Sequence, residues 1–152
     1  MKNQPLYYWD CDAGLATCIL TDGDNTFYGV AQCHEDDRDM MSEKTGYEIA
    51  YRRALIEALH HRANNELKPQ IKILKEVYYT MAHSKNYNKK SYESKMLFKK
   101  LKQLEEDLAT TRQIIKEEKE YVKNYIDAKD IFYKKIRSAR KGESIVKVFG
   151  QN

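Results

Sequence analysis

Glycine, proline, cysteine and long apolar runs are all scarce in this chain of 152 residues. Six glycines and two prolines leave few turns, which favours a long helical body and excludes a collagen-like fold. No apolar run approaches the roughly 18 residues that cross a bilayer, and the stretch 1–5 lacks the apolar segment of a secretory signal. Three cysteines are too few for a disulfide scaffold. We therefore expect a cytoplasmic protein that does not contact membranes.

Charged residues make up 33% of the chain and are unevenly distributed along it. Residues 1–50 hold ten acidic and three basic side chains, a net charge of −7, whereas residues 51–152 hold 24 basic and 13 acidic ones, a net charge of +11. A chain with an acidic head and a basic body can associate with copies of itself or bind an anionic partner along the body. Equally, the basic residues can be the solvated faces of helices.

The beginning of the chain is expected to form a small antiparallel β-sheet. The runs 14–20 and 27–33 are rich in apolar, aromatic and β-branched residues, and the turn formers between them include Asp22-Gly23. The stretch Leu6–Trp9 predicts a third strand. The run 14–20 is apolar on both faces, and two or three strands alone are marginal in water, so the sheet must pack on a helix or on a second copy of itself.

Two helices, at about 46–82 and 91–141, are expected to follow. The first begins at a capping box formed by Thr45 and Glu48. Pro69 lacks a backbone N–H and clashes with the preceding turn, so it predicts a kink or break in this helix at the residue before it. A short polar connector joins the two helices, which favours an antiparallel hairpin.

The second helix carries the clearest pattern in the chain, a stripe of apolar residues at alternating steps of four and three. Nine of its twelve positions are apolar, where the composition predicts about five. Such a heptad stripe is typical of a helix that packs along its length, here against the first helix and a second subunit. Ser91 predicts its start and Gly142 its end, and the run 144–149 predicts a short strand. The stripe consists of Leu97, Leu101, Leu104, Leu108, Thr111, Ile115, Glu118, Val122, Tyr125, Lys129, Phe132 and Ile136.

The sequence thus predicts an α+β protein in which a small antiparallel sheet packs on a long, coiled-coil-like helical hairpin. Its expected parts are a β-hairpin head over residues 1–42, a helical hairpin body over residues 43–142, and a short strand or tail over residues 143–152. Because the sheet is small and the stripe is long, we expect at least a dimer.

Motifs for catalysis, metal binding and cofactor binding are missing. The chain has no P-loop, no glycine-rich dinucleotide turn and no nucleophile elbow. Cys11, Cys18 and Cys33 contain no Cys-x-x-Cys pair, so we expect buried, inert thiols and not a zinc site. The acidic run 35–39 has no partner carboxylate cluster elsewhere in the sequence. We therefore expect no catalytic residue, no metal and no cofactor.

Lysines and aromatic residues alternate around the expected connector. The stretch Lys85–Lys102 holds seven lysines and one glutamate, interleaved with Tyr87, Tyr92 and Phe98. Lysines beside aromatic rings suit a partner that carries phosphates and bases. Alternatively, these lysines only solvate the end of a helical hairpin. The candidate patch for an anionic partner consists of Lys89, Lys90, Lys99 and Lys100.

Two consecutive arginines, Arg52 and Arg53, lie in the helix that must cover the sheet. One of them can face the strand that carries Phe27 and Tyr28, where a guanidinium beside aromatic rings can bind a phosphate through two hydrogen bonds. The alternative is a structural arginine paired with an acidic residue of the head. These four residues are the candidate ligand-binding set.

Four short runs within about residues 14–58 carry a resemblance. They are Gly14-Leu15-Ala16-Thr17, Phe27-Tyr28-Gly29-Val30-Ala31, Glu35-Asp36-Asp37 and Gly46-x-x-Ile49-Ala50-x-x-Arg53-Ala54. Together they resemble small proteins of bacterial viruses, and more specifically the Thoeris anti-defence sponge family. The resemblance implies a small antiparallel sheet followed by helices, an oligomer, and sequestration of cyclic ADP-ribose-type signals without cleavage. The heptad helix has no counterpart in it, and no ligand contact is transferred.

Two non-enzymatic functions follow from these patterns. The first is a phage-type counter-defence sponge, an oligomer in the host cytoplasm that binds and sequesters a nucleotide-derived signal. The alternative is an interaction protein whose basic helical hairpin binds nucleic acid or a host defence protein. A purely structural coiled-coil protein would need only the heptads.

Overall fold

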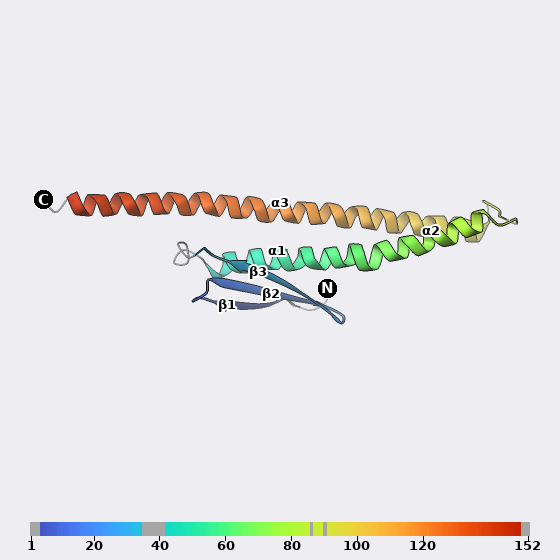
Figure 1. Cartoon of the computed structure of the whole chain (residues 1–152), viewed down its shortest axis with the longest axis horizontal. Helices are drawn as coiled ribbons and strands as arrows, with labels where there is room; N and C mark the ends of the chain where they lie inside the picture. Colours follow the sequence, from blue (N-terminus) through green and yellow to red (C-terminus); the bar gives the residue numbers. More distant parts are fainter. Residues whose placement is uncertain (1–3, 35–41, 86, 90, 150–152) are drawn as a thin grey trace. The chain divides into compact units, whose positions relative to one another are not determined.

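The computed structural model describes residues 4–34, 42–85, 87–89 and 91–149, and it confirms the predicted α+β fold (Figure 1). Three strands precede the helices. The elements are β1 (Leu6–Asp10), β2 (Leu15–Asp22), β3 (Asn25–Gln32), α1 (Glu43–His61), the π-helix η2 (Arg62–Leu67), α2 (Lys68–Ala82) and α3 (Tyr92–Phe149).

The chain divides into two compact units. The first, which we call the sheet unit, consists of Met1–Ala54 and Lys119–Asn152, and the second, the hairpin unit, consists of Leu55–Glu118. Helices α1 and α3 each contribute residues to both units. The units therefore differ from the predicted head and body, which were divided where the sheet ends.

The sheet is antiparallel with the strand order β1-β2-β3. Leu6 pairs with Ile19 across β1 and β2, and Cys18 pairs with Gly29 across β2 and β3. Strands β2 and β3 are joined by a two-residue turn, Gly23-Asp24, because Asp22 pairs with Asn25. The φ of Gly23 is +60°, a value that glycine adopts readily. The predicted hairpin and the third strand are thus confirmed, with a tighter turn than the sequence indicated.

Helix α1 covers one face of the sheet at very short range. Around Gly29 the buried strand side chains under the helix are small or medium in size, and Ala50 and Ala54 on the helix are both 0% exposed. Larger rings of the same face lie nearer the start of the helix, where Tyr7 and Trp9 of β1 pack beside Tyr47 of α1. At Gly29 the two backbones nearly touch, because a Cβ built there would lie 2.9 Å from the carbonyl carbon of Ala50. The buried strand residues on this face are Ala16, Cys18, Leu20, Gly29 and Ala31.

The predicted cap of the first helix is wrong, because the helix begins earlier. Ser42 is the capping residue: its Oγ accepts the backbone N–H of Thr45 at 3.1 Å and donates to Thr45 Oγ1 at 2.8 Å. Glu48, the predicted partner in the capping box, instead accepts hydrogen bonds from Arg52 and Tyr121.

The break predicted at Pro69 is present as the π-helix η2. The backbone N–H of Lys68 donates to the carbonyl of Ala63, five residues earlier, and Pro69 then stands in the first turn of α2. Because proline has no N–H, the regular bond to the carbonyl four residues back is lost there. The lost hydrogen bond is accommodated by the π-helical turn η2, and the chain continues as helix α2.

In the hairpin unit, α2 packs against the first part of α3. The core consists of Leu67, Ile71 and Leu104, with Leu74, Leu101 and Leu108 packed around it. Lys75 Nζ lies 3.2 Å from Glu105 Oε1 at the exposed edge of the same pair. The predicted start of α3 is confirmed, since Ser91 Oγ accepts the backbone N–H of Ser94 at 3.2 Å.

The heptad stripe of α3 is confirmed at all but one of its positions. Eleven of the twelve residues are buried or half-buried, whereas Phe132 is 53% exposed and its neighbour Tyr133 only 7%. A straight α-helix drifts by about 20° per heptad relative to a 3.5-residue repeat. Over the five heptads from Leu97 to Phe132 the drift reaches about 100°, the angle of one residue, and the buried position therefore moves to 133.

The predicted end of α3 at Gly142 and the short strand over 144–149 are wrong, because α3 continues to Phe149. A helix satisfies its own backbone hydrogen bonds, whereas a strand needs a partner strand. A glycine inside a helix costs only about 1 kcal/mol relative to alanine, which is too little to stop a helix by itself.

Candidate functional site

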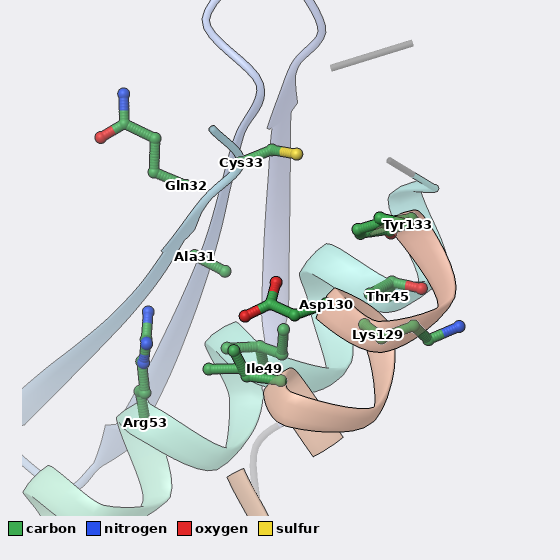
Figure 2. A pocket seen from close by; sticks show the side chains of 10 residues that line it. Ala31, Gln32, Cys33, Thr45, Ile49, Arg53, Lys129, Asp130 and Tyr133 are labelled. Carbon is green, nitrogen blue, oxygen red and sulfur yellow. The ribbon is translucent and has the colours of Figure 1, made fainter. Parts of the chain in front are cut away.

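A pocket opens in the sheet unit beside the end of strand β3, and we call it the β3-edge pocket (Figure 2). Its volume is about 110 Å³. Three separate parts of the chain form its walls: the end of β3, the first turns of α1, and the later part of α3. The lining residues are Ala31, Gln32, Cys33, Thr45, Ile49, Arg53, Ile126, Lys129, Asp130 and Tyr133.

Strand β3 holds Arg53 at one side of the pocket. Arg53 Nη1 donates to the carbonyl oxygen of Val30 at 2.6 Å. Because β3 is an edge strand, this carbonyl has no partner strand within the sheet, and the guanidinium supplies a donor in its place. A guanidinium carries five N–H donors in a planar fork, so one bond to the backbone leaves donors for an anion.

Helix α3 brings a carboxylate and a phenol to the opposite wall, while the ammonium group of Lys129 points away from the pocket (Figure 2). In Figure 2 the carboxylate of Asp130 and the guanidinium of Arg53 stand on facing sides of the pocket. Lys129 Nζ lies 5.7 Å from the ring centroid of Tyr125, and Tyr133 is almost fully buried. The pocket therefore combines groups that recognise anions, hydroxyl groups and rings.

Of the four predicted ligand-binding residues, the pocket contains only Arg53. Phe27 pairs with Leu20 on the helix-facing side of the sheet, whereas Tyr28 pairs with Ile19 on the other face and is 59% exposed. Successive side chains of a strand point to opposite faces, so these two aromatic residues cannot line the same wall.

Arg52 points away from the β3-edge pocket and belongs to a separate cluster. Its Nε donates to Glu48 Oε1 at 3.1 Å, and its guanidinium carbon lies 4.3 Å from the ring centroid of Tyr121. The Tyr121 hydroxyl donates to the same carboxylate oxygen at 3.2 Å, and this hydrogen bond raises the pKa of Tyr121. Arg52 thus has a structural pairing, as in the alternative, but its partner Glu48 lies in α1 and not in the predicted head.

The α3 residues of the pocket were missed by the sequence reasoning, although one signal pointed to them. Lys129 occupies a position of the apolar stripe where a hydrophobic residue is expected. A polar residue at a buried stripe position either finds a local partner, as Thr111 does by donating to the carbonyl of Asp107, or lines a site. Lys129 does both, since its ammonium group lies near the ring of Tyr125 and the residue lines the β3-edge pocket.

The predicted lysine patch lies in the hairpin unit. Lys89, Lys99 and Lys100 are exposed, and Lys90 lies outside the described residues. Of the three described lysines, Lys89 lines a cleft, which we call the tip cleft because it lies where α2 passes into α3. The cleft is formed by Tyr78, Tyr87, Lys89, Ser94, Lys95 and Phe98.

The cysteines differ in their surroundings. Cys18 is fully buried and burial raises its pKa, Cys33 is half-buried, and Cys11 is exposed. The prediction of buried thiols is therefore wrong for Cys11, which lies in the turn after β1, in contact with solvent. Across the described ranges, no group of three or more His, Cys, Asp or Glu residues is placed to hold a metal. The acidic run 35–39 lies outside the part of the chain that the structure describes.

No family model, curated protein or solved structure matches this chain. Among the described helices, none combines the length and the apolar character that crossing a membrane requires.

Proposed function

We propose that this protein is a non-enzymatic, phage-type counter-defence protein that binds and sequesters a nucleotide-derived signal in an oligomer, in the cytoplasm of the host. The observation that carries the proposal is the β3-edge pocket, where Arg53 faces Asp130 beside the ring of Tyr133. The resemblance to the Thoeris anti-defence sponge family supports it, because the resembling runs supply β3 and the start of α1, two of the three walls.

The charged groups of the pocket suit the parts of a nucleotide. Arg53 can bind phosphate oxygens through two parallel hydrogen bonds. Asp130 can accept the hydroxyl groups of a ribose, a role that carboxylates have in many nucleotide sites. A site with one cation and one carboxylate on facing walls therefore favours a ligand that carries both a phosphate and a sugar.

The size of the pocket supports an assembly of several subunits. A volume of about 110 Å³ is well below the roughly 300–1,000 Å³ of pockets that enclose a whole small-molecule ligand. One copy of the chain therefore covers only part of a nucleotide, and a second copy closes the rest. Apolar side chains that self-association would bury stand on the outer face of the sheet, including Tyr8 at 60% and Tyr28 at 59% exposure.

Retention of cyclic ADP-ribose tests the proposal. The protein is dialysed against this probe, and the retained compound is released by denaturation and identified by chromatography. The wild-type protein should retain the probe and release it unchanged. Hydrogen bonds to charged groups contribute about 1.5–3 kcal/mol, so Arg53→Ala should weaken retention by about tenfold or more. The matched control is Arg112→Ala, an exposed arginine of the hairpin unit, which should retain the probe like the wild type.

Two further arms separate binding from other activities. Changing Lys89, Lys90, Lys99 and Lys100 together to Ser should leave retention intact, and retention should depend only weakly on salt because the site is partly buried. Recovery of a converted product would contradict sequestration. Equal retention by the Arg53→Ala and Arg112→Ala proteins would exclude the β3-edge pocket as the binding site.

A second candidate function is contact between the basic hairpin and nucleic acid or a host defence protein. The exposure of Lys89, Lys99 and Lys100 around the tip cleft favours it.

A further inference from the structure

The tip cleft lies wholly within the hairpin unit and has a volume of about 350 Å³. This volume is in the range of pockets that hold small organic groups. The end of α2 supplies Tyr78, the connector supplies Tyr87 and Lys89, and the first two turns of α3 supply Ser94, Lys95 and Phe98. Aromatic residues, two lysines and three residues with hydroxyl groups therefore line one concave surface.

The aromatic wall is accessible to a flat ligand. Phe98 is 56% exposed, and its ring lies 6.5 Å from the ring of Tyr78, measured between centroids. The contact with Tyr78 holds one side of Phe98 while much of the ring remains in solvent. An exposed aromatic ring of this kind is a stacking platform for a base, whatever the identity of that base.

The three hydroxyl groups form a chain that ends at a buried serine. Tyr87 Oη lies 3.4 Å from Tyr78 Oη and 3.3 Å from Ser94 Oγ, and Ser94 is 3% exposed. Hydrogen bonds from Ser94 and Tyr78, together with the charge of Lys89, lower the pKa of Tyr87, while the pKa of Tyr78 is raised by its hydrogen bond with Tyr87. Either oxygen of each pair can be the donor. When the Tyr87 oxygen accepts from both neighbours, its own O–H can donate to a phosphate oxygen in the cleft.

We infer that the tip cleft binds one nucleotide of single-stranded nucleic acid, with the base on Phe98 and the phosphate among Lys89, Lys95 and the Tyr87 hydroxyl. A paired and stacked base of a duplex cannot enter a concave aromatic cleft, whereas an unpaired base can. The stretch Lys85–Lys102 carries seven lysines and one glutamate, so neighbouring phosphates of the same strand meet further cations outside the cleft. This inference rests on the second candidate function and names single-stranded nucleic acid as its partner. It does not depend on signal binding in the sheet unit.

Fluorescence anisotropy with a labelled oligothymidine of about 12 nucleotides, within the range of single-strand site sizes, tests the inference. Stacking on an aromatic side chain contributes about 1–3 kcal/mol per base, so Phe98→Ala should weaken binding by about tenfold. The matched control is Phe132→Ala on the same helix, since Phe132 is 53% exposed and lies outside the cleft, in the sheet unit. It should bind like the wild type. Both residues are half exposed, so both variants should keep the wild-type circular dichroism.

Two more variants test the phosphate contacts. Each phosphate contact contributes about 0.7 to the slope of log affinity against log salt for single strands. Lys89→Gln with Lys95→Gln should therefore reduce that slope by about 1.4, whereas Lys123→Gln with Lys134→Gln, on the part of α3 in the sheet unit, should not. Tyr87→Phe keeps the ring but removes the hydroxyl, and it should weaken binding several-fold.

Three outcomes would overturn the inference. One is equal binding by the Phe98→Ala and Phe132→Ala proteins. The second is binding of a duplex of the same length as tightly as the single strand. The third is thymidine monophosphate binding as tightly as the oligonucleotide, because a free nucleotide would then be the ligand and the lysines outside the cleft would contribute nothing. None of these results bears on retention of cyclic ADP-ribose, so failure here is distinguishable from failure of the signal-binding proposal.

Discussion

Replacing Gly29 by alanine should destabilise the sheet unit, although the same change in an ordinary strand is stabilising. Glycine in a strand interior costs about 0.5–1 kcal/mol relative to alanine through lost chain entropy. At position 29, however, an added Cβ would lie 2.9 Å from the carbonyl carbon of Ala50, and closer still to the Ala50 carbonyl oxygen and the Ala54 backbone nitrogen. All three atoms belong to the backbone of α1, so no side-chain rotation relieves the contact.

The size of the effect follows from the distance by which α1 must move. Carbon atoms prefer a separation of about 3.5–4.0 Å, so the helix and the strand must separate by at least about 0.6 Å. A gap of about 0.5–1 Å forfeits a quarter to a half of the dispersion energy between the surfaces, here between the buried strand residues and Ala50 and Ala54. Overpacking of this kind costs about 1–3 kcal/mol. Because all three short contacts are to backbone atoms, position 29 lies at the upper end of this range, about 3 kcal/mol. After the entropic gain of about 0.5–1 kcal/mol is subtracted, a net loss of about 2 kcal/mol is expected.

The single tryptophan of the chain provides the assay. Trp9 lies in β1 against Tyr47 of α1, with ring centroids 6.4 Å apart, so its fluorescence reports on contact between sheet and helix. With a urea m-value of about 1–3 kcal/mol/M, the Trp9 transition of Gly29→Ala should shift down by about 1 M urea. Gly23→Ala, where nothing lies within 4 Å of the new Cβ but φ is +60°, should show only the strain of the turn and an unchanged native Trp9 spectrum.

A double variant identifies the obstacle as backbone. Ala50→Gly removes the Cβ of Ala50 but leaves its carbonyl group in place, so it should not rescue Gly29→Ala. Rescue by Ala50→Gly, or a Gly29→Ala protein as stable as the wild type, would refute the reasoning.

Three further predictions concern the helical packing, the Tyr121 cluster and the assembly. Leu104 is 5% exposed in the core of the hairpin unit. Because Leu→Ala in a core costs about 2–5 kcal/mol, Leu104→Asp with Leu108→Asp should unfold that unit or dissociate the protein. Unchanged circular dichroism and particle size would contradict this prediction. The hydrogen bond to Glu48 raises the pKa of Tyr121, so its stabilising effect is complete below about pH 10 and is lost as the pH rises through the raised value. In a difference titration of tyrosinate absorbance, the wild type minus Tyr121→Phe should show one group that ionises above the ordinary tyrosine pKa. Light scattering should give at least twice the 18.0 kDa of one chain, and a mass of one chain at micromolar concentration would rule out the predicted oligomer.

Local patterns predicted the secondary structure well, because they depend on neighbours in the sequence. Strands β1 to β3, the break at Pro69 and the cap at Ser91 all follow from rules about residues within a few positions of one another. The errors at Thr45 and at the end of α3 have the same local origin. A stronger cap at Ser42 precedes Thr45. Within the described residues the sheet consists of β1, β2 and β3 alone, so the run 144–149 pairs with no strand there and continues the helix.

The composition of the β3-edge pocket could not be predicted in the same way. Arg53 was among the candidates because it stands next to the sheet in sequence, but Asp130 and Tyr133 reach the pocket only through the packing of α3 beside α1. The phase of a long helix decides which residues face inward, and a drift of about 20° per heptad moves the facing residue from 132 to 133. A strict seven-residue repeat therefore predicts that Phe132 faces inward, whereas Tyr133 is the buried residue.

The outer face of the sheet favours the expected oligomer over a single chain. The face covered by α1 buries small residues around Gly29, whereas the opposite face exposes four large apolar side chains. Leu6 is 54% and Val30 is 42% exposed there, beside Tyr8 and Tyr28. Full burial of one such side chain contributes about 1.5–3 kcal/mol of stabilising free energy. Covering the exposed parts of these four side chains would therefore add several kcal/mol per chain. Two copies that meet through this face double the gain, which then becomes comparable to the roughly 4–15 kcal/mol of lost freedom on association. The small residues around Gly29 therefore let the helix approach the sheet closely beside the β3-edge pocket, and the large side chains of the opposite face stand where a second subunit can cover them.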